Sequence, residues 1–166
     1  TQWIILGSGD KRIEDELASI AETAPKQVAA HIGFHDALAH RIEAAADLFV
    51  MPSHYEPCGL NQLYSLRYGT VPVVTATGGL ADTVVDTTAE SLANETATGF
   101  HLHEFSSQGL DDAIGRALHL RYHEKKNWNN LVRRAMAADW SWRKSASQYA
   151  ELYASAVSLN ESNDKQ

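Results

Sequence analysis

The sequence is poor in three features, and each shortage excludes a class of protein. One cysteine in 166 residues excludes a disulfide within the chain and is typical of a reducing compartment. No apolar run approaches the roughly 20 residues that a membrane-spanning helix needs. The 14 basic residues are outnumbered by 21 acidic ones, so we do not expect a nucleic-acid binder held by phosphate contacts. What remains, with 44% hydrophobic and 21% charged residues, is an ordinary globular composition.

Short apolar runs alternate with helical patterns along the chain. We expect strands at Trp3–Leu6, Val28–Ile32, Leu48–Met51, Val71–Thr75 and Gly99–Leu102. Apolar side chains at helical spacing predict helices over 13–24, 38–45, 59–68 and 80–85, and a pattern that is helical throughout after 108. This alternation predicts an α/β fold: a Rossmann-like, mainly parallel sheet with helices on both faces, followed by C-terminal helices.

The length suits a single α/β domain, which we expect over residues 1–158. Residues 159–166 lack apolar periodicity and are expected to fray. The first expected strand begins almost at once, after only Thr1 and Gln2. We therefore expect the chain to be a piece of a longer protein.

Four loops would lie at the carboxyl ends of the expected strands, where open α/β sheets bind ligands. They cover residues 7–10, 33–36, 53–61 and 75–80. The Gly7-Ser8-Gly9 turn lacks the third glycine of a dinucleotide-binding fingerprint. For that loop a tight strand-to-helix turn is therefore the favoured interpretation.

The third loop carries a carboxylate next to an expected helix start. Glu56 precedes Pro57, which disfavours helical backbone at Glu56 and favours a side chain that projects into the cleft. The backbone N–H groups of Gly59, Leu60 and Asn61 would be the unpaired first donors of the helix, a positive end suited to phosphate. A carboxylate beside an anion site fits a ligand with both phosphate and hydroxyl groups, such as a sugar nucleotide. The alternative is that Glu56 only caps the helix.

Three blocks of sequence carry a family resemblance. They are Pro-Ser-His-Tyr-Glu-Pro-Cys-Gly-Leu-Asn-Gln-Leu-Tyr at 52–64, Arg-Tyr-Gly-Thr-Val-Pro-Val-Val at 67–74 and Thr-Gly-Gly-Leu-Ala-Asp-Thr-Val at 77–84. Leu-Gly-Ser-Gly-Asp at 6–10, Ile-Gly-Phe-His at 32–35 and Asp-Trp-Ser-Trp at 139–142 follow the same order and spacing. Together they resemble the C-terminal lobe of bacterial glycogen synthases and plant starch synthases.

The resemblance implies the two-lobed GT-B fold, of which this chain would be the C-terminal, donor-binding lobe without its first strand. It implies a glycosyltransferase that moves glucose from ADP-glucose to the non-reducing end of an α-1,4-glucan with retention, without a cofactor or metal. In the family, the acceptor lobe and an Arg and a Lys that clamp the phosphates lie upstream of Thr1. We therefore expect the isolated chain to be inactive. The implied location is the bacterial cytoplasm, or the plastid for a plant enzyme.

The resemblance also implies roles for individual residues. Glu56 would act catalytically by contacting the donor glucose hydroxyls, and Cys58 would line the same pocket. The amides of Gly59, Leu60 and Asn61 would hold the distal phosphate; many relatives have Thr where this chain has Asn61.

Two further positions are implied for the nucleotide. Phe34 matches an aromatic that stacks on adenine, usually Tyr in the family. Tyr64 stands where many other retaining transferases carry a Glu that binds ribose, and this difference is itself typical of the glycogen and starch synthase branch.

Other interpretations stay open at this stage. The chain could be a non-catalytic Rossmann-like nucleotide-binding module, or part of a sugar-nucleotide epimerase with the same two-lobed fold. His119 and His123 have a zinc-compatible spacing, as His101 and His103 have on a short strand, but no third ligand is evident and a packing or surface role is favoured. Apolar residues of the last helix would lack a partner in an isolated lobe and favour self-association.

Overall fold

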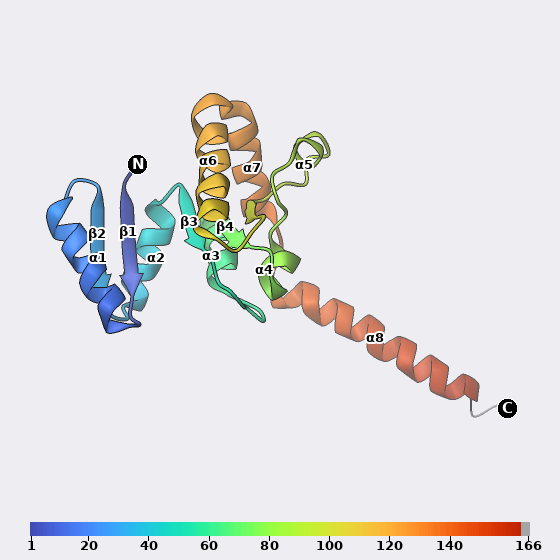
Figure 1. Ribbon diagram of the computed structural model, residues 1–166. Helices are drawn as coiled ribbons and strands as arrows, with labels where there is room; N and C mark the ends of the chain where they lie inside the picture. Colours follow the sequence, from blue (N-terminus) through green and yellow to red (C-terminus); the bar gives the residue numbers. More distant parts are fainter. Residues whose placement is uncertain (164–166) are drawn as a thin grey trace.

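The structure, a computed structural model, describes residues 1–163 and places five parallel strands in two sheets. Strand β1 (Trp3–Gly7) pairs with β2 (Val28–Ile32). Strand β4 (Val71–Thr75) lies between β3 (Leu48–Met51) and β5 (Phe100–Leu102). Figure 1 shows the two-stranded sheet at one end of the molecule and the three-stranded sheet at its centre. The parallel α/β class predicted from the sequence is confirmed.

Eight helices connect and cover these strands within the described residues. They are α1 (Lys11–Thr23), α2 (Asp36–Ala45), α3 (Asn61–Tyr68), α4 (Gly78–Thr83), α5 (Ala89–Ala93), α6 (Ser107–His123), α7 (Lys125–Ala137) and α8 (Trp142–Asn163). Local sequence explains several of their ends. Asp10 caps α1 by accepting from the Arg12 N–H at 2.9 Å, and Gly69 ends α3 in the left-handed conformation at φ 84°.

Besides small shifts at the ends of other elements, the structure differs from the sequence-based expectation in the sheet and in helices α3, α4 and α8. The expected single sheet is divided, because nothing in residues 1–163 pairs with β1 on its other edge or joins it to β3. Helix α3 begins at Asn61, two residues late, because Gly59 takes a left-handed φ of 73°. Helix α4 begins and ends two residues early. Helix α8 continues through the first part of the expected tail to Asn163, since no Gly or Pro interrupts it, and residues 164–166 lie outside the described part.

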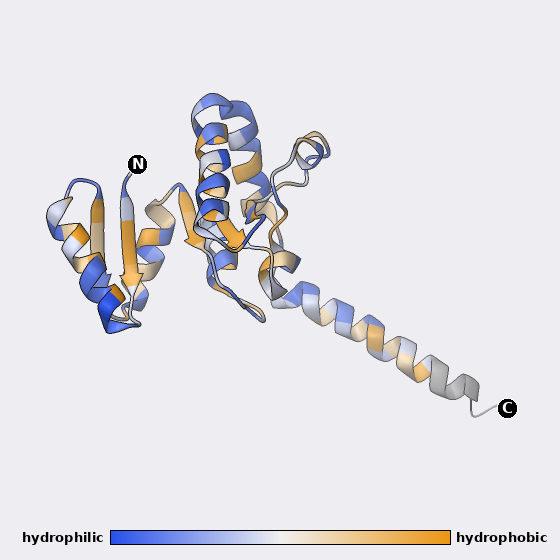
Figure 2. Cartoon of the chain, in the orientation of Figure 1, coloured by the Kyte–Doolittle hydropathy of each residue, from blue (hydrophilic) through white to orange (hydrophobic). Residues whose placement is uncertain are grey.

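The core lies in the three-stranded region. Val71, Val73 and Val74 of β4 are fully buried, and helices α6 and α7 cover one face of this sheet with residues such as Leu131. The apolar colouring of the central strands in Figure 2 marks the same place. By contrast, no residue from Thr1 to Arg41 is buried. The folded body therefore has one well-packed part and one open part.

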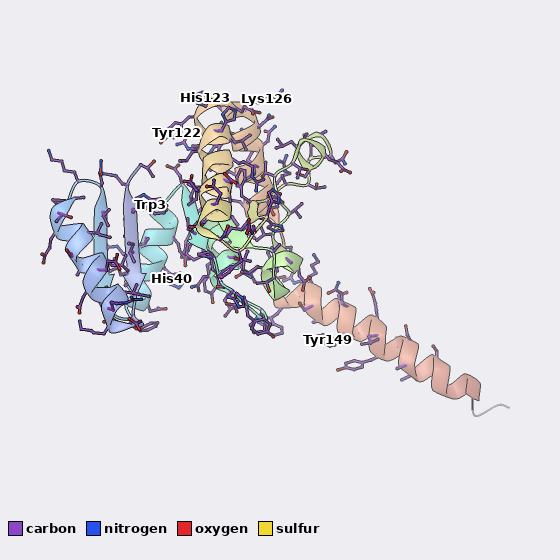
Figure 3. All side chains as sticks on the ribbon, viewed as in Figure 1. Trp3, His40, Tyr122, His123, Lys126 and Tyr149 are labelled. Atoms are coloured by element: carbon purple, nitrogen blue, oxygen red, sulfur yellow. The ribbon has the colours of Figure 1, made fainter. Side chains whose placement is uncertain are left out.

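Helix α8 projects away from the rest of the molecule (Figure 1). It carries exposed apolar side chains, among them Trp142, Tyr149, Leu152, Tyr153 and Val157. Figure 3 shows Tyr149 extending from α8 with no other element beside it. The helices of the described residues are all too short or too polar for a membrane span.

Candidate functional site

The predicted site residues gather on the loop that joins β3 to α3. Residue Leu60 occupies the capping position of α3, and no side chain caps the helix there. Within residues 1–163, the backbone N–H groups of Gly59, Leu60 and Asn61 donate no hydrogen bond. Asn61 is the first residue of α3, Leu60 is its cap and Gly59 precedes them, so these amides form a positive end that faces no acceptor among the described residues.

Glu56 lies four residues before this helix start and is half-buried. Its carboxylate makes no hydrogen bond or ion pair with any described residue. The interpretation of Glu56 as a mere helix cap is therefore wrong, since a cap would accept an N–H of the first turn. The carboxylate is available to a ligand instead. Cys58, two residues on, is a free and exposed thiol.

The fourth loop lies against the third. The Gly79 N–H donates to the Glu56 carbonyl oxygen at 3.1 Å. Gly78 takes a φ of 43°, and a Cβ placed there would lie 2.1 Å from the same oxygen. The two loops after β3 and β4 therefore meet backbone to backbone. Only glycine permits this approach.

The two residues predicted to contact the nucleotide lie on other elements. Phe34 is on the β2–α2 loop and is 90% exposed, so its ring is free to stack on a ligand. Tyr64 is on α3, one turn after the free amides, and is 40% exposed. Its ring lies 5.2 Å from the ring of His40 on α2, a residue labelled in Figure 3. Tyr64 therefore links the site helix to α2.

The histidines are engaged in packing and hydrogen bonds. His101 bonds through Nε2 to the Val84 carbonyl oxygen at 2.8 Å, and burial lowers its pKa. The rings of His119 and His123 lie 5.0 Å apart, and His54 packs edge-on against Phe105 at 4.8 Å. In the described part of the chain, no three His, Cys, Asp or Glu side chains group together in a way that could hold a metal ion.

A cavity of about 680 Å³ lies between α5 and α6, away from the predicted site. Its lining includes Leu92, Arg116 and His119, and none of the residues predicted to bind the donor.

Two side chains behind the Glu56 loop, one buried and one half-buried, escaped the sequence analysis. Gln62 on α3 and Thr83 on α4 both hydrogen-bond to this part of the backbone. The sequence does offer a signal for Gln62, because this polar residue stands second in a helix that has no capping side chain. Thr83 gave no signal, since its hydroxyl bonds to Gly79 within α4 and its other partner, Gln62 on α3, is 21 residues away in the sequence.

Comparisons with known proteins agree on one family. A family model described as "Glycosyl transferases group 1" matches residues 1–135. A glycogen synthase of Rhodopirellula baltica is 64% identical over 160 residues, and one of Thioalkalivibrio sulfidiphilus is 53% identical over 157. Each match covers 32% of the relative, and 96% and 95% of this chain, respectively. The chain thus spans about a third of the length of these curated relatives.

A solved structure is similar over the same extent. It is the catalytic domain of starch synthase IV from Arabidopsis thaliana, bound to ADP and acarbose. The TM-score is 0.82 at 37% identity, over 95% of this chain and 32% of that one. A sucrose-phosphate synthase from Thermosynechococcus elongatus, at 23% identity and a TM-score of 0.61, shares the fold.

Proposed function

The chain belongs to the group 1 glycosyl transferases, and on that premise we propose that it is the donor-binding lobe of a glycogen or starch synthase. The whole enzyme transfers glucose from ADP-glucose to the non-reducing end of an α-1,4-glucan with retention. The observation that carries the proposal is the pairing of a free Glu56 carboxylate with three free backbone amides at the start of α3. The 64% identical bacterial glycogen synthase supports the choice of donor and acceptor.

The geometry suits electrostatic catalysis. Breaking the bond between glucose and ADP builds negative charge on the leaving phosphate and positive charge on the sugar ring. The amides of Gly59, Leu60 and Asn61 stabilise the phosphate, and Glu56 binds the sugar hydroxyls while Cys58 lines their pocket. Phe34 stacks on the adenine, and Tyr64 borders the ribose. These groups supply one side of the site.

The other side of the site needs cations and an acceptor-binding surface. None of the ion pairs in residues 1–163 involves Glu56, and the formal charge of the chain is −7. An anionic donor therefore requires basic side chains from outside these residues. Such side chains come from the rest of the enzyme, so the chain alone has little or no transferase activity. We place the reaction in the bacterial cytoplasm, or in the plastid for a plant enzyme.

A chimera tests the proposal. This chain replaces the matched segment of the Rhodopirellula baltica protein, to which it is 64% identical. We expect the chimera to transfer glucose from ADP-glucose to glycogen, and Glu56→Gln to lower kcat/KM by at least about 100-fold. The unaltered relative is the control for assay conditions. A folded chimera without transferase activity would contradict the proposal.

The two alternatives differ in what the chimera and the chain would do. A non-catalytic nucleotide-binding module would bind ADP in calorimetry and give an inactive chimera. An epimerase would convert the sugar of the donor without transfer to glucan. The free carboxylate of Glu56 favours the transferase, because a module that binds only nucleotide has no use for a carboxylate near the sugar.

We propose in addition that the isolated chain self-associates through α8. Trp142 is 87% exposed and Tyr153 66%, so the helix presents apolar surface to water. Sedimentation over a concentration series tests this. A strict monomer at high concentration would contradict it.

A further inference from the structure

We propose that Gln62 and Thr83 are positioning residues, whose side chains fasten the Glu56–Gly59 loop to helix α4 and so set where Glu56 and the free amides lie. This inference rests on the proposed function of the same loop. Gln62 and Thr83 support that loop from behind, and in the proposal above they contact neither the sugar nor the phosphate.

Gln62 is the centre of the arrangement. It is 0% exposed, and its side-chain nitrogen donates to the carbonyl oxygens of Cys58 at 3.1 Å and Gly59 at 3.2 Å. Because backbone carbonyls can only accept, the nitrogen end of the amide must face them. The Oε1 atom of Gln62 has no partner among the described residues. Two of the hydrogen bonds of this buried side chain therefore go to the loop backbone, and the third goes to Thr83.

Thr83 extends the contact to α4. Its hydroxyl donates to the Gly79 carbonyl oxygen at 2.5 Å and accepts from the Gln62 side-chain nitrogen at 3.2 Å. The two hydrogen bonds therefore form a chain, in which Gln62 donates to Thr83 and Thr83 donates to the backbone of Gly79. Such a chain polarises its members and holds both ends in place.

The backbones of the loop and α4 touch where these side chains join them. A Cβ placed at Gly79 would lie 2.0 Å from the Cys58 carbonyl oxygen, closer than any real contact. Figure 1 shows the β3–α3 loop reaching down beside α4. The loop therefore rests on a short helix and is held from behind by two side chains. A displacement of about 1 Å in a supporting element is enough to cost about 100-fold in rate.

The first experiment measures the loop in the 166-residue chain. Gln62→Glu puts a carboxylate oxygen where the amide nitrogen faces two carbonyls, and Thr83→Val removes the hydroxyl at nearly constant volume. We expect hydrogen exchange at the Gly79 N–H, which bonds to Glu56, to quicken by at least about tenfold in both. Thr83→Ser keeps the hydroxyl, so exchange at the Gly79 N–H should stay as slow as in the unaltered chain. Exchange in β4 reports whether each variant is folded.

Matched controls separate the loop from general effects. Gln148→Glu makes the same chemical change on exposed α8, and should leave exchange at Gly79 as it is. Gly79→Ala adds the forbidden Cβ, whereas Gly115→Ala adds one on α6 with nothing within 4 Å. Unchanged exchange at Gly79 in both Gln62→Glu and Thr83→Val would overturn the inference.

The second experiment measures kinetics in the chimera described above. We expect Gln62→Glu and Thr83→Val to lower kcat/KM for ADP-glucose by about 10- to 100-fold and Thr83→Ser to restore it. The KM for glucan should not change, whereas a general loss of folded structure would change it as well. Full activity of Gln62→Glu and Thr83→Val would overturn the inference. Should the unaltered chimera be inactive, the proposed function fails, and the exchange experiment still decides whether Gln62 and Thr83 hold the loop.

Discussion

The two sheets of the molecule differ sharply in burial. Four consecutive residues of β4, Val71 to Val74, are buried, while no residue from Thr1 to Arg41 is. Strand β4 has a partner strand on each edge and helices packed against it, whereas β1 pairs with β2 alone within residues 1–163. Ile4 in β1 is consequently 55% exposed. Burial follows from the number of neighbours, because both strands are similarly apolar.

The difference teaches that the core lies in the three-stranded region, whereas the residues predicted to contact a ligand come from both regions. The three-stranded region contains the core and the Glu56 loop, and the two-stranded region contributes the exposed ring of Phe34. Substitutions in the first should change the free energy of unfolding. Those in the second should change affinity for a ligand.

The largest expected effect is in the core. Phe100 on β5 is 1% exposed, and Phe100→Ala should lower the free energy of unfolding by about 3–5 kcal/mol through lost burial and a cavity. Ile4→Ala on β1 should cost less than about 1 kcal/mol. Urea unfolding followed by circular dichroism measures both. Equal losses of unfolding free energy in the two variants would contradict the contrast in burial between the two regions.

A second test compares ion pairs. Asp86, whose side chain is 14% exposed, accepts from the His101 N–H at 2.7 Å and from Arg116 at 3.2 Å. Asp86→Asn should cost about 1.5–3 kcal/mol, because Arg116 loses its partner in a partly buried place. The Lys11–Asp15 pair on α1 is exposed, and Lys11→Ala should leave the urea midpoint unchanged. A large loss at Lys11 would contradict the contrast between the regions.

A third test looks for function in the open region. Phe34→Ala removes a ring that is already 90% exposed, so the urea midpoint should stay the same. Stacking on a base contributes enough that affinity for ADP should fall about tenfold in the chimera, measured by calorimetry. Phe34→Tyr keeps the ring and serves as the control. Unaltered affinity in Phe34→Ala would remove this residue from the site.

The smallest effect concerns Glu43 on α2, which is 5% exposed with Oε2 unpaired. Burial raises the pKa of Glu43, and the charge of nearby His40 lowers it to a smaller extent. A carboxyl group with a raised folded-state pKa stabilises the fold fully below its unfolded pKa and loses that contribution as pH rises through the folded value.

The unaltered chain should therefore lose stability between about pH 4 and pH 7, relative to Glu43→Gln. Urea midpoints at the two pH values measure the difference, and Glu43→Gln should be at least as stable at the higher one. Parallel pH profiles for the two proteins would contradict the assignment of this dependence to Glu43.

Local sequence predicted much of the fold. The apolar runs gave β2, β3 and β4 with their observed bounds, and Asp10 and Gly69 marked helix ends, because these signals act within a few residues. The start of α3 was predicted too early, since the left-handed Gly59 is held by contacts with Gln62. The hydrogen bond between Gln62 and Thr83 joins residues 21 positions apart, so periodicity could not reveal it. The roles of Glu56, Cys58 and Phe34 remain predictions.

Helix α8 also gives the molecule an unusual outline in solution. Its 22 residues make a rod of about 33 Å, comparable to the width of a small domain. A monomer with such an arm tumbles anisotropically and sediments more slowly than a sphere of 18.3 kDa. Whatever binds the far half of this helix is held at least about 16 Å from its first residue, Trp142. Rotational diffusion should then report binding at α8 even when the loop itself does not move.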